Sequence, residues 1–179
     1  MLAALKFLFA TLILAVNTLV LCSSMIPFAL AKLVLPITPV RHVCDRALMG
    51  IAALWMDINN FWLGAVNPIR WQVSGVDGLD PRGWYLVASN HQTWVDILVL
   101  QRVFNRRIPM LKFFTKKELI YVPVIGLAWW ALDFPFMQRK GGASARADLE
   151  AGRKACEKFR LVPTSVMSFV EGTRFTPAK

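Results

Sequence analysis

A run of 25 residues without a charged side chain, from Phe7 to Ala31, constrains this chain more than any other feature. As one helix, the run would be about 37 Å long at 1.5 Å per residue, enough to cross a hydrocarbon core of about 30 Å. We therefore expect attachment to a membrane. Because Pro27 and the polar Asn17 interrupt the run, one kinked span and two shorter helices in one leaflet both fit the pattern.

Two other interpretations of this run remain open. Lys6 ahead of an apolar block is typical of a cleaved signal peptide, but no small-residue cleavage site closes the block. Cys22 gives a faint similarity to a lipoprotein cleavage site, although the preceding Leu21 is not small. We expect the run to be a membrane anchor.

Most charged residues of the chain lie after the apolar run in the sequence. Lys and Arg number 21 against 11 Asp and Glu, for a net charge of +10, and 17 of the basic residues lie after residue 66. The 7 Trp and 12 Phe exclude a disordered polycation. No nucleic-acid-binding motif accompanies the charge, so we expect no nucleic-acid partner. Arg41 and Arg46 favour a cytoplasmic location for the following domain, as in a bacterial inner membrane protein.

Apolar side chains recur every three or four residues from Ala47 to Val66, which predicts an amphipathic helix. Trp55 and Trp62 suit the lipid headgroup layer, where the apolar part of an indole is buried and its N–H stays wet. A core helix of the following domain would show the same pattern. We assign residues 1–66 to a membrane anchor with interfacial helices and residues 67–179 to one further domain.

The rest of the chain alternates apolar strands with helices, which predicts an α/β sheet with helical crossovers. The expected strands are Ile69–Val73, Trp84–Ser89, Ile108–Phe113, Phe134–Gln138 and Thr164–Val170. The expected helices are Trp94–Val103, turns within Thr115–Ala131 that Pro123 interrupts, and Ser144–Phe159. The continuous apolar character of Trp84–Ser89 predicts a strand that is buried on both faces.

His91 directly follows the strand expected to end at Ser89, where α/β sheets bind ligands. On a regular helix, His91 and Asp96 would lie roughly 140° apart, so they can meet only if the chain turns between them. Thr93 supplies a turn if its hydroxyl caps a helix by accepting the amide of Asp96. Asp96 could then hold one imidazole nitrogen, leaving the other to accept a proton. A loop histidine beside a helix-start acid is the structural alternative.

A second polar group follows the strand expected to end at Val170. In Glu171-Gly172-Thr173-Arg174, glycine permits close backbone approach, threonine offers a hydroxyl, and arginine can bind a phosphate with two hydrogen bonds. Lys116 and Arg139 add cations at other element ends. These residues predict a basic rim that holds an anionic headgroup, a phosphate or a coenzyme, although a surface turn with solvated charges is the alternative.

The order of these motifs resembles the glycerolipid acyltransferases. The matching residues are Asn90-His91-x4-Asp96, Lys116-Lys117-Glu118-Leu119 with Pro123 and Gly126, Phe136-Met137-Gln138-Arg139, and Glu171-Gly172-Thr173-Arg174. Over about residues 69–174, the chain is similar to the 1-acylglycerol-3-phosphate acyltransferase family, and nearer its lysocardiolipin acyltransferase-like branch.

The resemblance implies an acyltransferase-type α/β domain with a mixed sheet, preceded by an N-terminal membrane-binding helical segment. It implies transfer of a fatty acyl group from acyl-CoA or acyl carrier protein to the free hydroxyl of a lysophospholipid such as 1-acylglycerol-3-phosphate. His91 would be the general base and Asp96 its orienter, with no metal and no cofactor apart from the acyl donor. The residues implied to bind the acceptor are Arg139, Glu171, Gly172, Thr173, Arg174 and Lys116.

The sequence departs from the family pattern in two places. Asp133 stands where the family usually has glycine, and Lys179 ends the sequence before the family's fourth motif. The second departure predicts a C-terminally incomplete domain. A non-catalytic, membrane-binding remnant of such an enzyme is therefore the alternative to an active acyltransferase.

Overall fold

A computed structural model describes residues 2–66, 69–93, 95–138, 144–160 and 162–170. The chain forms two compact units that are interleaved in sequence. One unit combines Met1–Gln72 with Ile120–Asp133, and the other combines Val73–Leu119 with Phe134–Lys179. The assignment of residues 1–66 and 67–179 to separate domains stays a prediction.

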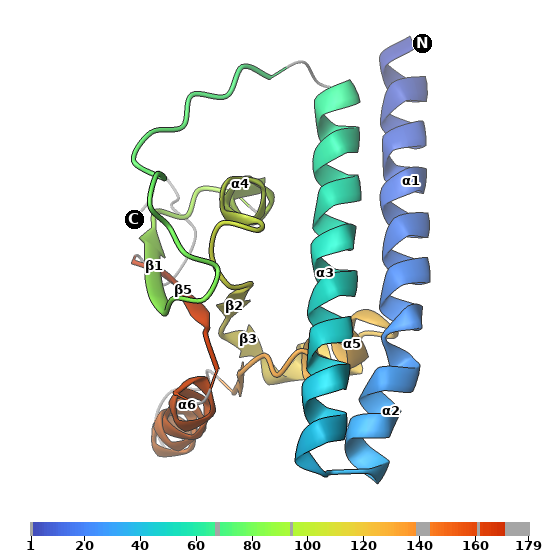
Figure 1. Ribbon diagram of the computed structural model, residues 1–179. Helices are drawn as coiled ribbons and strands as arrows, with labels where there is room; N and C mark the ends of the chain where they lie inside the picture. The colour runs from blue at the N-terminus through green and yellow to red at the C-terminus, as the bar shows by residue number, and fades with distance from the viewer. Residues whose placement is uncertain (1, 67–68, 94, 139–143, 161, 171–179) are drawn as a thin grey trace. The chain divides into compact units, whose positions relative to one another are not determined.

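The first unit begins with the helices α1 (Leu2–Ser24), α2 (Ile26–Val34) and α3 (Thr38–Val66), of which α1 and α3 are long (Figure 1). Ala4–Val34 is a 31-residue helical stretch whose most apolar 18 residues have a mean hydropathy of 2.1, so it is long and apolar enough to cross a membrane. Only 11% of its most apolar window is buried in the protein, unlike a soluble core helix. The break between α1 and α2 lies at Met25, because Pro27 has no amide hydrogen and its ring disfavours a continuous helix.

Helix α3 begins nine residues earlier than the predicted start at Ala47. The Thr38-Pro39 pair explains the difference, because proline is favoured in the first helical turn, where its missing amide needs no partner. One face of α3 is buried, and its buried residues are Cys44, Leu48, Ala52, Met56 and Asn59. These positions recur at spacings of three and four, so the amphipathic pattern is confirmed.

Polar contacts join α1 to α3. The Asn17 amide donates to Asn59 Oδ1 at 2.8 Å and to the Trp55 carbonyl at 3.2 Å. The Trp55 indole N–H donates to the Thr18 hydroxyl at 3.1 Å, and that of Trp62 donates to the Ala10 carbonyl at 3.3 Å. Both indole N–H groups therefore donate to acceptors on α1 rather than to water, and the location of these rings in a headgroup layer stays a prediction.

Helix α5 (Ile125–Ala131) completes the first unit and contacts α1 and α2. Its entry is strained, because Val124 has φ 65° and ψ −54°, a conformation that β-branched residues rarely adopt. The Ile125 amide donates to the Pro123 carbonyl at 2.7 Å across this turn.

A partly buried lysine, Lys32, ties α2 to the segment after α5. Lys32 Nζ lies 2.6 Å from Asp45 Oδ1 and 3.1 Å from Asp133 Oδ2, and it donates to the Ala131 carbonyl at 3.1 Å. Asp133 has φ 57°, a left-handed conformation that glycine adopts at little cost. In this chain aspartate adopts that conformation, and its carboxylate binds Lys32.

The second unit contains a three-stranded sheet in the order β1-β5-β2. Its strands are β1 (Tyr85–Ser89), β5 (Ser165–Phe169) and β2 (Leu111–Phe113). A second sheet pairs β3 (Thr115–Lys116) with β4 (Phe136–Met137). Every pairing among the described strands is parallel, so the α/β class is confirmed, but no antiparallel pair of the expected mixed sheet lies within the described residues.

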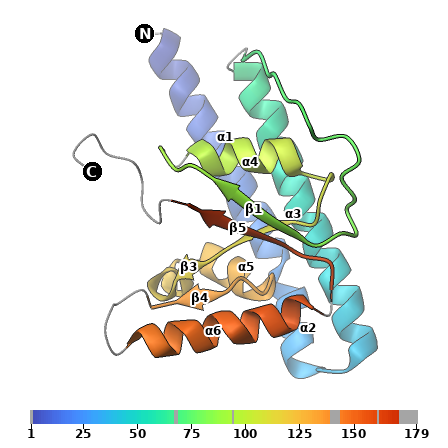
Figure 2. The ribbon, with the colours of Figure 1, turned by 90° about the vertical axis from the view of Figure 1, so that its left-hand side faces the viewer.

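Helix α4 (Val95–Phe104) covers one face of the three-stranded sheet (Figure 2). There Leu100 and Phe104 pack against a core that contains Leu111 and Met167. The opposite face is more open, since Leu86 is 77% exposed. The prediction that this first strand is buried on both faces is therefore wrong.

Helix α6 (Ser144–Phe159) contacts β4, where the Gln138 amide donates to Asp148 Oδ1 at 2.6 Å. The other end of α6 lies beside the three-stranded sheet, because the Trp84 indole donates to the Phe159 carbonyl at 2.8 Å. The predicted helix Ser144–Phe159 is confirmed.

Two further sequence predictions differ from the structure. Ile69–Val73 is irregular rather than a strand, and the side chains of Ile69, Trp71 and Val73 are exposed. These residues have high strand propensity, but a strand needs a paired neighbour to be stable. Thr115–Ala131 forms a short strand, a 3₁₀-helix at Lys117–Tyr121 and then α5, rather than helical turns alone.

Candidate active site

The carboxyl ends of β1, β5 and β2 lie at the same edge of the sheet because all three strands are parallel. Ser89 at the end of β1 pairs with Phe169 at the end of β5. His91 follows β1 by two residues, so it lies at this edge. Parallel α/β sheets bind ligands at this edge.

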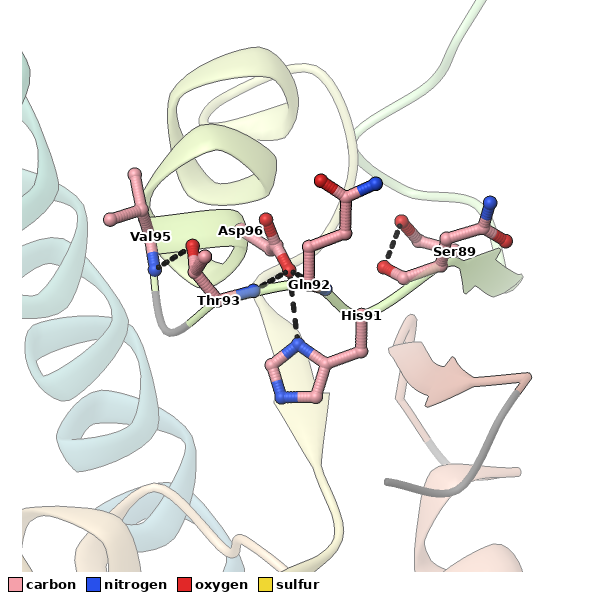
Figure 3. Close-up of polar contacts among 7 residues, drawn as sticks. Ser89, His91, Gln92, Thr93, Val95 and Asp96 are labelled. Carbon is pink, nitrogen blue, oxygen red and sulfur yellow. Dashed lines mark hydrogen bonds and ion pairs between the residues drawn. The ribbon is translucent and has the colours of Figure 1, made fainter. Parts of the chain in front are cut away.

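His91 and Asp96 meet as the turn between them predicts. His91 Nδ1 lies 3.0 Å from Asp96 Oδ2 (Figure 3). The same carboxylate oxygen accepts the backbone amides of Gln92 at 2.7 Å and Thr93 at 2.9 Å. One oxygen therefore holds both the imidazole and the loop that carries it.

The turn differs from the prediction in one bond. The Thr93 hydroxyl accepts the amide of Val95 at 3.2 Å, one residue before the predicted donor Asp96. The Asp96 amide instead donates to the Thr93 carbonyl at 3.3 Å. At a helix start, the capping threonine and an acid three residues later commonly form two reciprocal hydrogen bonds. Here one of these bonds is present, because the Asp96 carboxylate accepts the Thr93 amide.

The environment of Asp96 favours its ionised form. The Thr93 amide, with smaller contributions from His91 and the Gln92 amide, lowers the pKa of Asp96 below its ordinary value. An ionised carboxylate can only accept hydrogen bonds. The proton of a neutral His91 therefore resides on Nδ1, and Nε2, which points away from Asp96 in Figure 3, carries the lone pair.

Phe169 stacks on His91, a contact that the sequence prediction missed. The two ring centroids lie 3.9 Å apart and the planes differ by 15°. Phe113 follows at 6.3 Å from Phe169. No local sequence signal marks this contact, because it depends on the register in which β1 pairs with β5. That register sets Ser89 beside Phe169, and His91 lies two residues further along.

The other predicted site residues divide into two groups. Lys116 is the last residue of β3 and lies in the two-stranded sheet, whereas His91 follows a strand of the three-stranded sheet. The side chain of Lys116 is exposed. Arg139, Glu171, Gly172, Thr173 and Arg174 lie outside the described residues. Their roles remain predictions, as do the catalytic roles of His91 and Asp96.

Comparison with known proteins gives a consistent set of similarities. The acyltransferase family model matches residues 70–179. A 1-acyl-sn-glycerol-3-phosphate acyltransferase 3 from Arabidopsis thaliana is 38% identical over 97 residues, which cover 52% of this chain and 25% of that protein. An uncharacterized acyltransferase from Schizosaccharomyces pombe is 36% identical over 135 residues, 75% of this chain and 42% of the relative.

A solved structure shares the fold. The crystal structure of PlsC, the 1-acyl-sn-glycerophosphate (LPA) acyltransferase from Thermotoga maritima, matches with a TM-score of 0.53 at 20% identity. The match covers 94% of this chain and 63% of that chain. The matched regions span between a quarter and about two fifths of the two curated relatives above.

Proposed function

The chain belongs to the acyltransferase family, and from this premise we propose that it transfers a fatty acyl group to the free hydroxyl of a lysophospholipid. The donor is an acyl thioester, on coenzyme A or acyl carrier protein, and the acceptor is 1-acylglycerol-3-phosphate or a related lysophospholipid. The observation that carries the proposal is the contact of His91 Nδ1 with Asp96 Oδ2 at the carboxyl edge of the sheet.

In the proposed reaction, Nε2 of His91 takes the proton of the acceptor hydroxyl as its oxygen attacks the thioester carbonyl carbon. Asp96 stabilises the imidazolium that forms, because its carboxylate lies 3.0 Å from Nδ1. The tetrahedral intermediate then expels the thiolate, which takes the proton from His91. One ester forms, one thioester breaks, and the histidine returns to its neutral form.

We assign the acceptor phosphate to the basic residues that the family pattern supplies. Arg139 and Arg174 would hold phosphate oxygens, and Glu171, Gly172 and Thr173 would contact the glycerol and phosphate. The exposed Lys116 is a further cation for this group. Fixed cations hold an acceptor in place, which lowers the entropic barrier to attack.

Membrane attachment through Ala4–Val34 would bring both lipid substrates to the enzyme. The outward side chains of this stretch support it, since Phe7 is 70% exposed and Leu33 is 62% exposed. We propose that the site faces the cytoplasm, as in a bacterial inner membrane enzyme, because Arg41 and Arg46 follow the apolar stretch.

The test uses the full chain in detergent micelles with labelled acyl-CoA or acyl carrier protein and lysophosphatidic acid. We expect labelled phosphatidic acid from the parent chain and from His42→Ala, and at least about 10²-fold less from His91→Ala. His42 is a matched control, because the chain has only two histidines and His42 is exposed on α3. Equal product from His91→Ala would refute the base assignment, and lipid binding without turnover by the parent would support the non-catalytic alternative.

A further inference from the structure

We infer that Phe169 is a positioning residue for His91: its ring is the flat support that fixes the plane of the imidazole and so the direction of Nε2. The two centroids lie 3.9 Å apart and the planes differ by only 15°. This inference rests on the proposed function, because it concerns the residue proposed as the general base.

The hydrogen bond to Asp96 does not by itself determine the plane of the imidazole. It fixes one ring atom, Nδ1, at 3.0 Å from Oδ2. The second side-chain torsion of histidine has a broad energy profile, and a hydrogen bond tolerates a range of angles, so the ring can still tilt while this contact is kept. A stacked ring restricts that rotation, because turning the imidazole would lose the flat contact. The stack therefore adds to the hydrogen bond in limiting the direction of Nε2.

Phe169 is well placed to act as a rigid support. It ends β5, the central strand of the sheet, which is paired with β1 on one side and β2 on the other. Its ring packs against the core cluster that contains Ile108, Leu111 and Met167. His91, by contrast, lies in an irregular segment after β1. The rigid strand therefore supports the imidazole of a less regular segment.

The stacked face also limits water around the base. The His91 side chain is only 15% exposed, although its backbone lies outside a helix or strand. The aromatic row continues from Phe169 to Phe113 at 6.3 Å and then to Phe134 at 6.5 Å. Phe113 belongs to the same core cluster as Phe169, which makes it a matched control.

The test compares Phe169→Leu, Phe169→Tyr and Phe113→Leu in the full chain, with kcat and KM measured for both substrates. Leucine removes the flat face, so Phe169→Leu should lower kcat by about threefold to tenfold, the range that stacked aromatic pairs support. KM should change by less than about twofold, because no substrate contact is lost. Phe169→Tyr keeps an aromatic ring and should keep most of the parent kcat. Phe113→Leu should have the same kcat as the parent.

An NMR measurement tests the stack in the unmodified chain, and it stands even if Phe169→Leu fails to fold. The ring protons of His91 should be shifted upfield by the Phe169 ring current, with His42 as the internal reference. A parent spectrum without this shift would overturn the inference, as would an equal fall in kcat for Phe113→Leu. An unchanged kcat in folded Phe169→Leu would also overturn it. Parent-level activity in His91→Ala would instead refute the proposed base, so the two failures are distinguishable.

Discussion

Replacing Asp96 by asparagine removes one negative charge at the point where three donors converge. Asp96 Oδ2 accepts His91 Nδ1 at 3.0 Å and the amides of Gln92 and Thr93 at 2.7 and 2.9 Å. The asparagine oxygen can still accept hydrogen bonds, so the loop should keep its shape. What is lost is the charge that stabilises an imidazolium on His91.

The expected fall in kcat follows from losing the charge of Asp96 while keeping its hydrogen bonds. General base catalysis by a positioned histidine contributes about 10²–10⁴-fold to a rate, which sets the largest loss that a residue acting through His91 can cause. Asp96 is partly exposed, with 26% of its side chain accessible, so water screens part of its charge. We therefore expect Asp96→Asn to lower kcat by about 10²-fold, near the lower end of this range, with KM nearly unchanged.

The assay is a double-mutant cycle with His91→Ala. If Asp96 acts only through His91, then Asp96→Asn should change the residual rate of His91→Ala by less than about twofold. Asp80→Asn is the matched control, because Asp80 Oδ1 accepts the Arg82 amide at 2.8 Å in a turn of the same unit. That amide lowers the pKa of Asp80 as Thr93 lowers the pKa of Asp96.

Two results would refute this reasoning. An equal fall of kcat in the parent and in the His91→Ala background would show that Asp96 acts independently of the histidine. A similar loss in Asp80→Asn would show that any turn aspartate of this unit affects the rate through stability alone.

Three further predictions concern stability. Lys32→Met should lower the free energy of unfolding by about 2 kcal/mol, less than for a fully buried ion pair because Asp45 and Asp133 stay partly exposed; an unchanged midpoint in denaturant would contradict it. Val124→Gly should raise stability by up to about 1 kcal/mol, because glycine relieves the strain at φ 65°, and a lower melting temperature would argue against that strain. The lowered pKa of Asp96 stabilises the fold at pH values above the unfolded pKa of about 3.9, and this contribution is lost as the pH falls through the lower pKa of the folded state. Unfolding curves measured down to about pH 2 should therefore show a smaller acid-induced loss of stability for Asp96→Asn than for the parent. Superimposable pH profiles of the two proteins would exclude the effect.

Elements with a strong local signal could be predicted from the sequence. The helix expected at Trp94–Val103 corresponds to α4 within one residue at each end, and the strand expected at Thr164–Val170 contains β5. The turn that joins His91 to Asp96 was also predictable, because Thr93 and Asp96 lie within one helical turn of each other. Such patterns are set by residues only a few positions apart.

Contacts between distant segments were not predictable in the same way. Ile69–Val73 has a good strand sequence, but it lacks a strand partner among the described residues and stays irregular. Trp55 and Trp62 looked suited to a lipid interface, but their N–H groups donate to α1. In each case the residue type is compatible with more than one environment, and the contacts with distant segments determine which one it occupies.

The sequence by itself determined the apolar stretch, the alternation of strands and helices, and the motif order that identifies the acyltransferase family, because each is written in composition or short-range spacing. Only the tertiary structure decided that Phe169 stacks on His91, and that Asp133 adopts a left-handed conformation beside Lys32. The physical reason is that these contacts depend on strand register and on the packing of segments far apart in the chain. A pair such as His91 and Phe169, 78 positions apart, meets only once β1 and β5 have aligned.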